Sequence, residues 1–264
     1  MSIEYKFPLS TQLSLLSTIF ITGTDTGVGK SIFSAYLALQ LKAEGKQVAI
    51  SKPIQTGNPK DTDYLTELTA NKIPIFNTYS FELPAAPSVS AQHENRTVDI
   101  KKIIFDIKKL EEEFDVVIVE GIGGIAVPLR DQGPGTRDQE LYPKFSGSIV
   151  HSPMSSIQYL VADLIKDLNY PIVVVCRPSL GTINHSVLTI EFAKQKGLNV
   201  LGFIISGFNK NSSDKAELTA PDEIEKITNC QCLVKIPYLT NIYHSLATKE
   251  DSPSSKAPSS LANV

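Results

Sequence analysis

The residues that could do chemistry begin with Gly29, Lys30 and Ser31, which follow a β-branched run and open a helical pattern. The turn before them starts at Gly23 and is rich in Gly and Thr, so its backbone N–H groups can line one concavity at the positive end of a helix. Such a concavity suits a polyphosphate, with Lys30 reaching the β- and γ-phosphates and the Ser31 hydroxyl on Mg²⁺. The sequence therefore predicts a nucleotide-binding loop, although the strict phosphate-loop pattern requires a glycine where the chain has Thr24.

Charged side chains also follow two other strand-like runs. Lys52 comes directly after one of them, and Glu120 ends the other. Because the carboxyl ends of parallel strands meet at one edge of a sheet, we expect both side chains beside the phosphate loop. Lys52 can neutralise charge on a transferring phosphoryl group, and Glu120 suits the acidic position that holds Mg²⁺. Of the two carboxylates that follow Lys52, Asp63 suits a metal ligand and Asp61 a helix N-cap.

The elements that must position these residues alternate between strand-like and helical patterns. Val- and Ile-rich runs, typical of parallel strands covered on both faces, occur at Thr18–Thr22, Gln47–Ser51, Val116–Glu120, Ile172–Cys176, Val200–Ser206 and Leu233–Ile236. Helical spacing of apolar residues occurs at 30–44, 61–70, 99–113, 155–168, 183–196 and 221–228. The alternation predicts an α/β fold of the P-loop NTPase type, with a doubly wound, mainly parallel sheet and helices on both faces.

One domain over residues 1–248 is the simplest organisation, because a chain of 264 residues suits one large core. Residues 131–153 are polar, rich in Gly, Pro and Ser, and show no period, which predicts an inserted surface loop. Residues 249–264 are rich in Ser and Pro, which predicts a disordered tail.

Composition and charge exclude several classes of protein. A net charge of −3 argues against a surface built to hold nucleic acid or an anionic membrane. No apolar run approaches the ~20 residues that span a bilayer, and the first ten residues lack the pattern of a signal peptide. Three cysteines do not suggest a disulfide framework. We expect a cytoplasmic protein whose partners include neither nucleic acid nor membrane.

Four segments, taken in this order, resemble the dethiobiotin synthetase family, whose phosphate loop is offset by one position in the same way. Any one segment is a weak signal because partition and amidotransferase ATPases share the loop, but the combination is specific. The resemblance covers roughly residues 17–240, apart from the 131–153 loop. The matching segments are Gly23–Ser31, Lys52–Gly57, Val119–Pro128 and Leu180–Thr189.

The resemblance implies a homodimer that closes a cyclic urea on 7,8-diaminononanoate, using CO₂, ATP and Mg²⁺. One amine would take up CO₂ as a carbamate, which the γ-phosphate would activate as a carbamic–phosphoric mixed anhydride. The second amine would then close the ureido ring. Such a site must hold the carbamate in line with the γ-phosphate and stabilise charge on the equatorial oxygens. By family position, the catalytic residues Lys30 and Lys52 would stabilise that charge, with Lys52 also touching the carbamate.

The same resemblance implies binding roles for further residues. Ser31, Asp63 and Glu120 would hold Mg²⁺. Lys52 and Thr56 would contact the substrate, and a turn of the partner subunit would receive the far carboxylate on Leu180, Gly181, Thr182, Ile183 and Asn184. ATP would contact a larger set, namely Thr26, Gly27, Val28, Gly29, Lys30, Ser31, Ile32, Asp63, Glu120, Gly121, Gly123, Ser206, Gly207, Asn209, Ile236, Pro237 and Tyr238.

The chain departs from the family pattern at two positions of the predicted site. Ser206 stands where the family often has an adenine-reading Asn, so Asn209 is the candidate to read the base in its place. Ile122 stands where the family has Ala in the Glu-Gly-Ala-Gly-Gly stretch, and its larger side chain must point away from the phosphates.

Two alternatives come from other classes. An amide-forming synthase of the cobyrinic acid diamide type normally carries a glutaminase domain with a nucleophilic Cys, and no segment here provides one. A partition or regulatory ATPase usually has a lysine at the position of Asp25 and often basic DNA-binding patches, and neither feature is present in the sequence.

Overall fold

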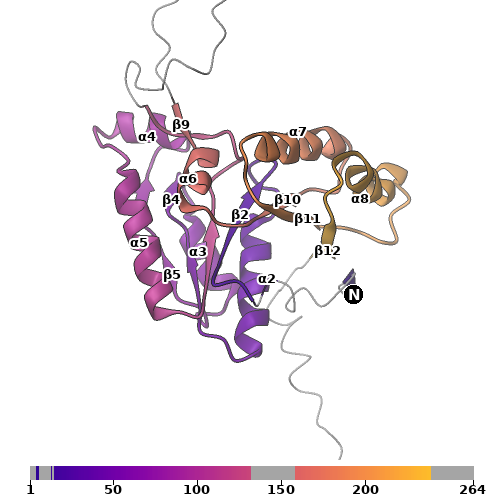
Figure 1. Cartoon of the computed structure of the whole chain (residues 1–264), viewed down its shortest axis with the longest axis horizontal. Coiled ribbons are helices and arrows are strands. Elements are labelled where there is room, and N and C mark those ends of the chain that lie inside the picture. The colour runs from indigo at the N-terminus through magenta and orange to yellow at the C-terminus, as the bar shows by residue number, and fades with distance from the viewer. Residues whose placement is uncertain (1–3, 6–12, 14, 132–157, 239–264) are drawn as a thin grey trace, which may run out of the picture.

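The computed structural model describes residues 4–5, 13, 15–131 and 158–238 of the chain (Figure 1). Its main sheet has eight strands in the order β1-β12-β11-β10-β2-β7-β3-β5. All neighbouring pairs are parallel except β1–β12 at one edge. The strands are β1 (Glu4–Tyr5), β2 (Thr18–Gly23), β3 (Val48–Ser51), β5 (Ile75–Phe76), β7 (Val116–Glu120), β10 (Ile172–Cys176), β11 (Val200–Ser206) and β12 (Cys232–Ile236).

The buried residues of the sheet divide between two hydrophobic clusters, one on each face. Ile19 and Ile21 of β2 pack with α2 (Lys30–Ala43) and α3 (Asp61–Leu68), whereas Phe20 faces the other cluster. That second cluster includes residues of α5 (Ile100–Glu113), α6 (Val161–Leu168), α7 (Thr182–Gln195) and α8 (Lys215–Thr228). The predicted doubly wound sheet with helices on both faces is therefore confirmed.

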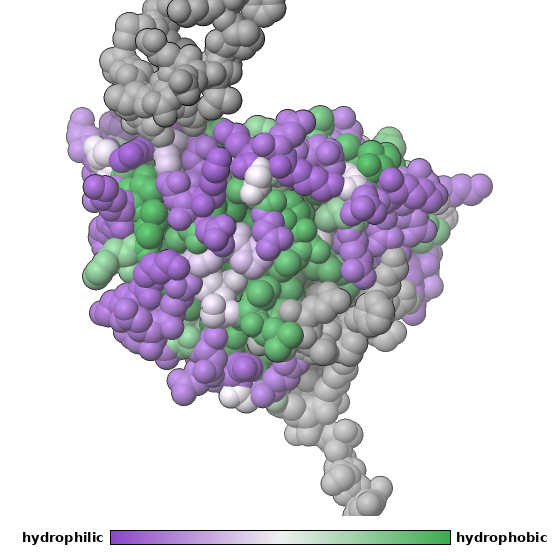
Figure 2. All heavy atoms as spheres, in the orientation of Figure 1, coloured by the Kyte–Doolittle hydropathy of each residue, from purple (hydrophilic) through white to green (hydrophobic). Residues whose placement is uncertain are grey.

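Short elements at the carboxyl edge of the sheet complete the domain. β4 (Ile54–Thr56) pairs in parallel with β6 (Tyr79–Phe81), β8 (Pro128–Asp131) pairs antiparallel with β9 (Gln158–Leu160), and α4 (Pro87–His93) lies beside both β4 and β8. Figure 2 shows mostly polar side chains over α7 and α8, with hydrophobic side chains gathered over the central strands. No helix of the described residues is both long and apolar enough to cross a membrane.

Three predicted boundaries were wrong. α8 begins at Lys215, because the side chain of Asp214 caps the N–H of Ala216, and Pro221 is accommodated inside the helix. α6 begins at Val161, since Gln158–Leu160 is a strand. Residue 61 is the first residue of α3 and not its N-cap, which is Lys60. Apart from Asp131 at the end of β8, the predicted loop 131–153 lies outside the described residues, as does the predicted tail 249–264.

Candidate active site

The phosphate loop joins β2 to α2 as the sequence predicts. Gly29 is the N-cap of α2 and has a φ of 99°, in the left-handed region that favours glycine. A Cβ atom at this position would also lie 2.8 Å from the Cβ of Ser206, so the end of β11 packs directly against the loop. Inside the loop, the buried Lys30 donates from Nζ to the carbonyl oxygen of Asp25 at 2.9 Å.

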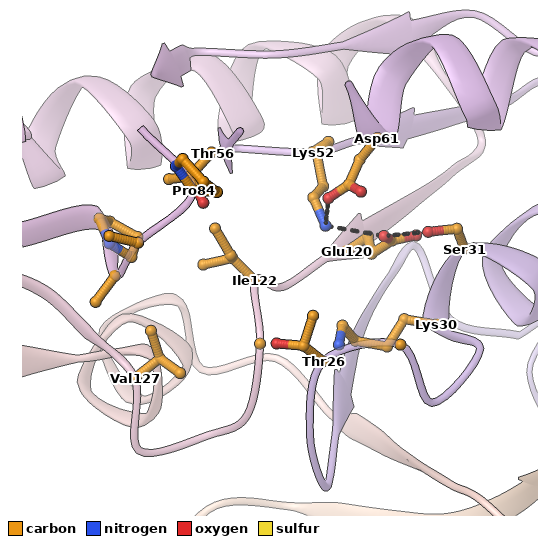
Figure 3. Close-up of a pocket in the computed structure, with 15 residues that line it drawn as sticks. Thr26, Lys30, Ser31, Lys52, Thr56, Asp61, Pro84, Glu120, Ile122 and Val127 are labelled. Atoms are coloured by element: carbon orange, nitrogen blue, oxygen red, sulfur yellow. Dashed lines mark hydrogen bonds and ion pairs between the residues drawn. The ribbon is translucent and has the colours of Figure 1, made fainter. Parts of the chain in front are cut away.

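Side chains from two neighbouring strand ends, those of β3 and β7, and from the starts of two helices, α2 and α3, meet beside this loop. The Nζ atom of Lys52 lies 2.9 Å from Oε1 of Glu120 and 2.7 Å from Oδ2 of Asp61. The Ser31 hydroxyl donates to the same Glu120 oxygen at 2.8 Å, and Lys52 also donates to the carbonyl oxygen of Gly121 at 3.1 Å. Figure 3 shows Lys52, Asp61, Glu120 and Ser31 on one side of the cavity, joined by these interactions. We call these four residues the Glu120 cluster.

The two lysines of the site have pKa values shifted in opposite directions. Burial, together with the nearby Lys52 ammonium, lowers the pKa of Lys30 to about 8. Burial also acts to lower the pKa of Lys52, but the carboxylates of Glu120 and Asp61 outweigh that effect and raise the pKa above its usual value. Lys52 is therefore a buried, permanently charged ammonium, whereas Lys30 can lose its proton in the free chain near pH 8.

A cavity of about 420 Å³ opens between the phosphate loop and the Glu120 cluster. One side of it is polar and carries Lys30, Ser31, Lys52, Asp61 and Glu120. The other side is apolar, and Figure 3 shows Ile122 projecting between the Thr56–Pro84 side and Thr26. The apolar lining consists of Pro84, Ala85, Ala86, Pro87, Ile122 and Val127. The cavity can therefore take a molecule with a charged end and an aliphatic chain.

The structure brings many predicted site residues together around this cavity. Those that line it are Thr26, Gly27, Lys30, Ser31, Lys52, Thr56, Glu120 and Gly123. Asp63 does not line it, because it lies in the first turn of α3 with its side chain exposed, whereas Asp61, two residues earlier, faces the cavity. Val28 is buried beneath the loop, Ile32 is half-buried in α2, and Gly121 lies beside Phe20.

The segments predicted to bind the base meet on the far side of the phosphate loop. The backbone N–H of Gly207 donates to the carbonyl oxygen of Ile236 at 2.9 Å, which ties the ends of β11 and β12 together. Asn209 is exposed, and its side-chain oxygen accepts from the N–H of Asn211 at 3.1 Å. Pro237 is buried, but Tyr238 is 80% exposed. An amide and an aromatic ring are thus available at this edge.

The segment predicted to bind the far carboxylate lies outside the cavity of its own chain. Gly181 is the N-cap of α7 with a φ of 91°, and Thr182 is buried in the first turn. Leu180 is 85% exposed, while Ile183 is half-buried and Asn184 is exposed. The contribution of this turn to a partner's site stays a prediction.

The sequence did not predict the apolar wall of the cavity or an ion pair beside the phosphate loop. The apolar wall from Pro84 to Pro87 leads into α4, which begins at Pro87 and has only seven residues, too few to show a helical period. An ion pair joins Arg177 to Asp25 at 2.6 Å, and the N–H of Thr26 together with Arg177 holds the pKa of Asp25 below its usual value. The signal for this pair in the sequence is a basic residue directly after the β10 strand, at the edge of the sheet where the phosphate loop also lies.

The Glu120 cluster fits a magnesium ion by the chemistry of its donors. Mg²⁺ is bound by one or two carboxylates together with water and substrate phosphates, and the cluster offers two carboxylates and a hydroxyl. Oε2 of Glu120 is buried without a hydrogen-bond partner, which is unfavourable unless a cation or donor is supplied. The described residues contain no group of three or more His, Cys, Asp or Glu side chains able to hold a metal by themselves.

Comparison with known proteins assigns the chain to a family. The model of a family described as an AAA domain matches residues 17–133 and 148–244. A protein of Methanococcus vannielii named ATP-dependent dethiobiotin synthetase BioD is 40% identical over 71% of this chain and 78% of its own length. One of the same name from Thermodesulfovibrio yellowstonii is 34% identical over 84% and 89% of the two chains.

Solved structures support the fold alone. The cell division ATPase MinD of Pyrococcus furiosus aligns with a TM-score of 0.50 and 14% identity, over 91% of this chain and 93% of that one. A ParA family ATPase of Chlorobium tepidum gives the same score and identity over 90% and 93%. With the phosphate loop, the Glu120 cluster and the two relatives taken together, the chain belongs to the family of ATP-dependent dethiobiotin synthetases.

Proposed function

We propose that this chain uses ATP to close the ureido ring of dethiobiotin from 7,8-diaminononanoate and CO₂. The observation that carries the proposal is the Glu120 cluster, which places a charged lysine and two carboxylates in one cavity with the phosphate loop. Family membership supplies the reaction class, and the cavity has the polar and apolar sides that a diamino acid with an aliphatic chain requires.

The proposed reaction has three steps. One substrate amine attacks CO₂ and loses a proton, which gives a carbamate. A carbamate oxygen then attacks the γ-phosphorus of ATP, so that ADP leaves and a carbamic–phosphoric mixed anhydride forms. The second amine attacks the carbamate carbon, the C–O bond to the phosphate breaks, and the ring closes with release of phosphate and a proton. No covalent bond to the enzyme is needed.

The chain's own residues position the reactants and stabilise charge. Lys30 lies in the loop that would hold the β- and γ-phosphates, and the ammonium of Lys52 would stabilise the carbamate and the equatorial oxygens during transfer. Ser31, Glu120 and Asp61 would hold Mg²⁺, which supplies charge neutralisation to the phosphates. Asp61 suits this role better than Asp63, since its carboxylate faces the cavity and is in contact with Lys52.

The apolar side of the cavity suits the aliphatic chain of the substrate. Ile122, Val127 and Pro84 would cover its methylene groups, while Thr56 at the end of β4 lies where it can donate to the reacting end. We further propose a homodimer in which the turn at 180–184 receives the far carboxylate of the partner's substrate. Leu180, which is 85% exposed just before α7, and Leu188, which is 62% exposed in the middle of that helix, support an interface there.

An isotope experiment tests this proposal. The chain is incubated with Mg·ATP, 7,8-diaminononanoate and ¹⁸O-labelled bicarbonate, and both products are examined by mass spectrometry after short times, before label exchanges with water. Because the anhydride breaks at the carbamate C–O bond, we expect dethiobiotin together with inorganic phosphate that carries one ¹⁸O atom. Dethiobiotin formed with unlabelled phosphate would exclude the anhydride, and the absence of dethiobiotin would exclude the activity.

A further inference from the structure

The Lys52 ammonium pairs with one oxygen atom of each carboxylate in the Glu120 cluster. Its Nζ lies 2.7 Å from Oδ2 of Asp61 and 2.9 Å from Oε1 of Glu120. The Ser31 hydroxyl, the remaining donor of the cluster, donates a hydrogen bond to the same Glu120 oxygen at 2.8 Å. The lysine therefore stands among the residues proposed above to hold Mg²⁺.

An ammonium and a divalent cation compete for these ligands. Mg²⁺ binds oxygen atoms at about 2.0–2.1 Å, and Oε1 of Glu120 already accepts hydrogen bonds from Lys52 and Ser31. Two positive charges within one ion-pair distance of each other also repel strongly at a site screened from water. With Lys52 in place, Oε2 of Glu120 still has no hydrogen-bond partner. The cluster is thus held together by Lys52 but remains able to take a stronger cation.

We propose that the Lys52 ammonium occupies the cation position of the Glu120 cluster and is displaced from it when the magnesium–nucleotide complex binds. The cavity of about 420 Å³ that Lys52 lines gives its ammonium room to move, and four methylene groups give the side chain the reach. Once displaced, the ammonium finds new partners in the γ-phosphate and the carbamate. The cation position and that last step both rest on the proposed function.

The exchange has a consequence for the order of events. Lys52 is 1% exposed and bound to two carboxylates, so it has little capacity to interact with a carbamate in the free chain. The ammonium becomes available only when the cation has taken its place. The lysine would thereby couple metal binding to readiness for the carbamate.

Metal binding without nucleotide tests the exchange. The full chain is titrated with Mn²⁺, free ion being measured by electron paramagnetic resonance, for the natural protein, Lys52→Met and Lys60→Met. Lys60 pairs with Glu82 at 2.9 Å, so its substitution removes the same charge from a neighbouring ion pair outside the cluster. We expect Lys52→Met to bind Mn²⁺ at least about tenfold more tightly than the natural protein, because a like charge has gone, and Lys60→Met to stay within about twofold. Equal or weaker binding by Lys52→Met overturns the proposal.

A second variant keeps the test decisive if Lys52→Met folds poorly. Lys52→Gln retains a donor for Glu120, and its thermal unfolding is followed with and without Mg²⁺. We expect Mg²⁺ to raise the melting temperature of Lys52→Gln by clearly more than that of the natural protein, since the cation replaces the missing ammonium. An equal shift in both proteins contradicts the exchange. Neither measurement depends on turnover, so failure here is distinct from failure of the ring-closing activity.

Discussion

The Nζ atom of Lys52 lies 2.9 Å from Oε1 of Glu120, and both side chains are almost completely buried. Desolvating two charges costs more free energy than many such pairs return, while breaking one by removing a partner is strongly destabilising. A buried pair of this kind therefore has little value for stability compared with well-packed apolar residues. At the edge of a nucleotide loop, its presence is better explained by charge that the reaction uses.

Lys52→Ala is expected to abolish ring formation while nucleotide binding is largely retained. The ammonium would act on charge that develops during transfer, and loss of one such stabilising group costs about a hundredfold or more in kcat. The measurement is dethiobiotin formation by mass spectrometry, with ADP titration in parallel. Lys60→Ala serves as the control. Unaltered turnover would remove Lys52 from the mechanism.

Glu120→Gln is expected to lower stability as well as activity. The substitution leaves the buried Lys52 with one charged partner, Asp61, and the loss of a buried pair costs about 3–5 kcal/mol when one member is removed. Chemical unfolding measures the change in the free energy of unfolding. Glu82→Gln is the matched control, because it breaks a surface pair with Lys60. If both variants unfold alike, the charge on Glu120 is not what balances Lys52.

Lys30 is expected to make nucleotide binding depend on pH. Its pKa of about 8 in the free chain means that the side chain is largely neutral above that pH, and bound phosphates favour the charged form. Above pH 8, ADP binding should therefore take up a proton and weaken as the pH rises. Calorimetry at pH 8.5 in two buffers of different ionisation enthalpy measures this uptake, and Lys30→Met should lack it. Binding without proton uptake in the natural protein would contradict the lowered pKa.

The lowered pKa of Lys30 is also expected to make the free energy of unfolding depend on pH. An unfolded chain holds the lysine proton up to pH 10.5, whereas the folded chain releases it near pH 8. Between these values the unfolded state binds more protons, so this lysine makes the free protein more stable as the pH rises through that window. Denaturant unfolding at pH 8 and pH 9.5 should show a smaller gain for Lys30→Met than for the natural chain. An identical gain in both would assign the effect to other groups.

Ile122→Ala is expected to loosen substrate selection. Ile122 projects into the cavity on its apolar side, and removing three carbons forfeits contact with the aliphatic chain (Figure 3). At about 0.8 kcal/mol for each fully buried CH₂ group, of which part is retained at a half-buried site, KM for the diamine should rise by about three- to tenfold with kcat less affected. The variant should also accept a diamine with one branching methyl group more readily than the natural chain. Ile104→Ala, at a partly buried isoleucine of α5 outside the cavity lining, is the control. An unchanged KM for Ile122→Ala would place the aliphatic chain of the substrate elsewhere.

Local patterns were sufficient to predict the centre of the fold and most of the polar side of the cavity. Val- and Ile-rich runs indicate buried parallel strands. The carboxyl ends of parallel strands lie at one edge of the sheet, so Lys30, Lys52 and Glu120 meet there whatever the conformation of the loops. The prediction that Ile122 must point away from the phosphates is consistent with its place on the apolar wall. These inferences needed only strand polarity and burial.

Features that depend on tertiary contacts were not predicted. The sequence alone does not show which of Asp61 and Asp63 faces the cavity. Because α3 begins at Asp61, the two carboxylates point to different sides of its first turn, and only Asp61 lines the cavity. The wall from Pro84 to Pro87 has no periodicity of its own and is placed by packing of α4 against β4 and β8. The early start of α8 was obscured by Pro221, which usually marks a helix beginning.

The most direct test of the central claim is the substrate dependence of phosphate release from Mg·ATP. The assay is run with the complete mixture, and with either 7,8-diaminononanoate or bicarbonate left out, while dethiobiotin is quantified in the same samples. We predict phosphate release that requires both substrates and matches dethiobiotin mole for mole. Phosphate release that ignores the diamine and yields no ring product would contradict the account and indicate an ATPase of the switch type.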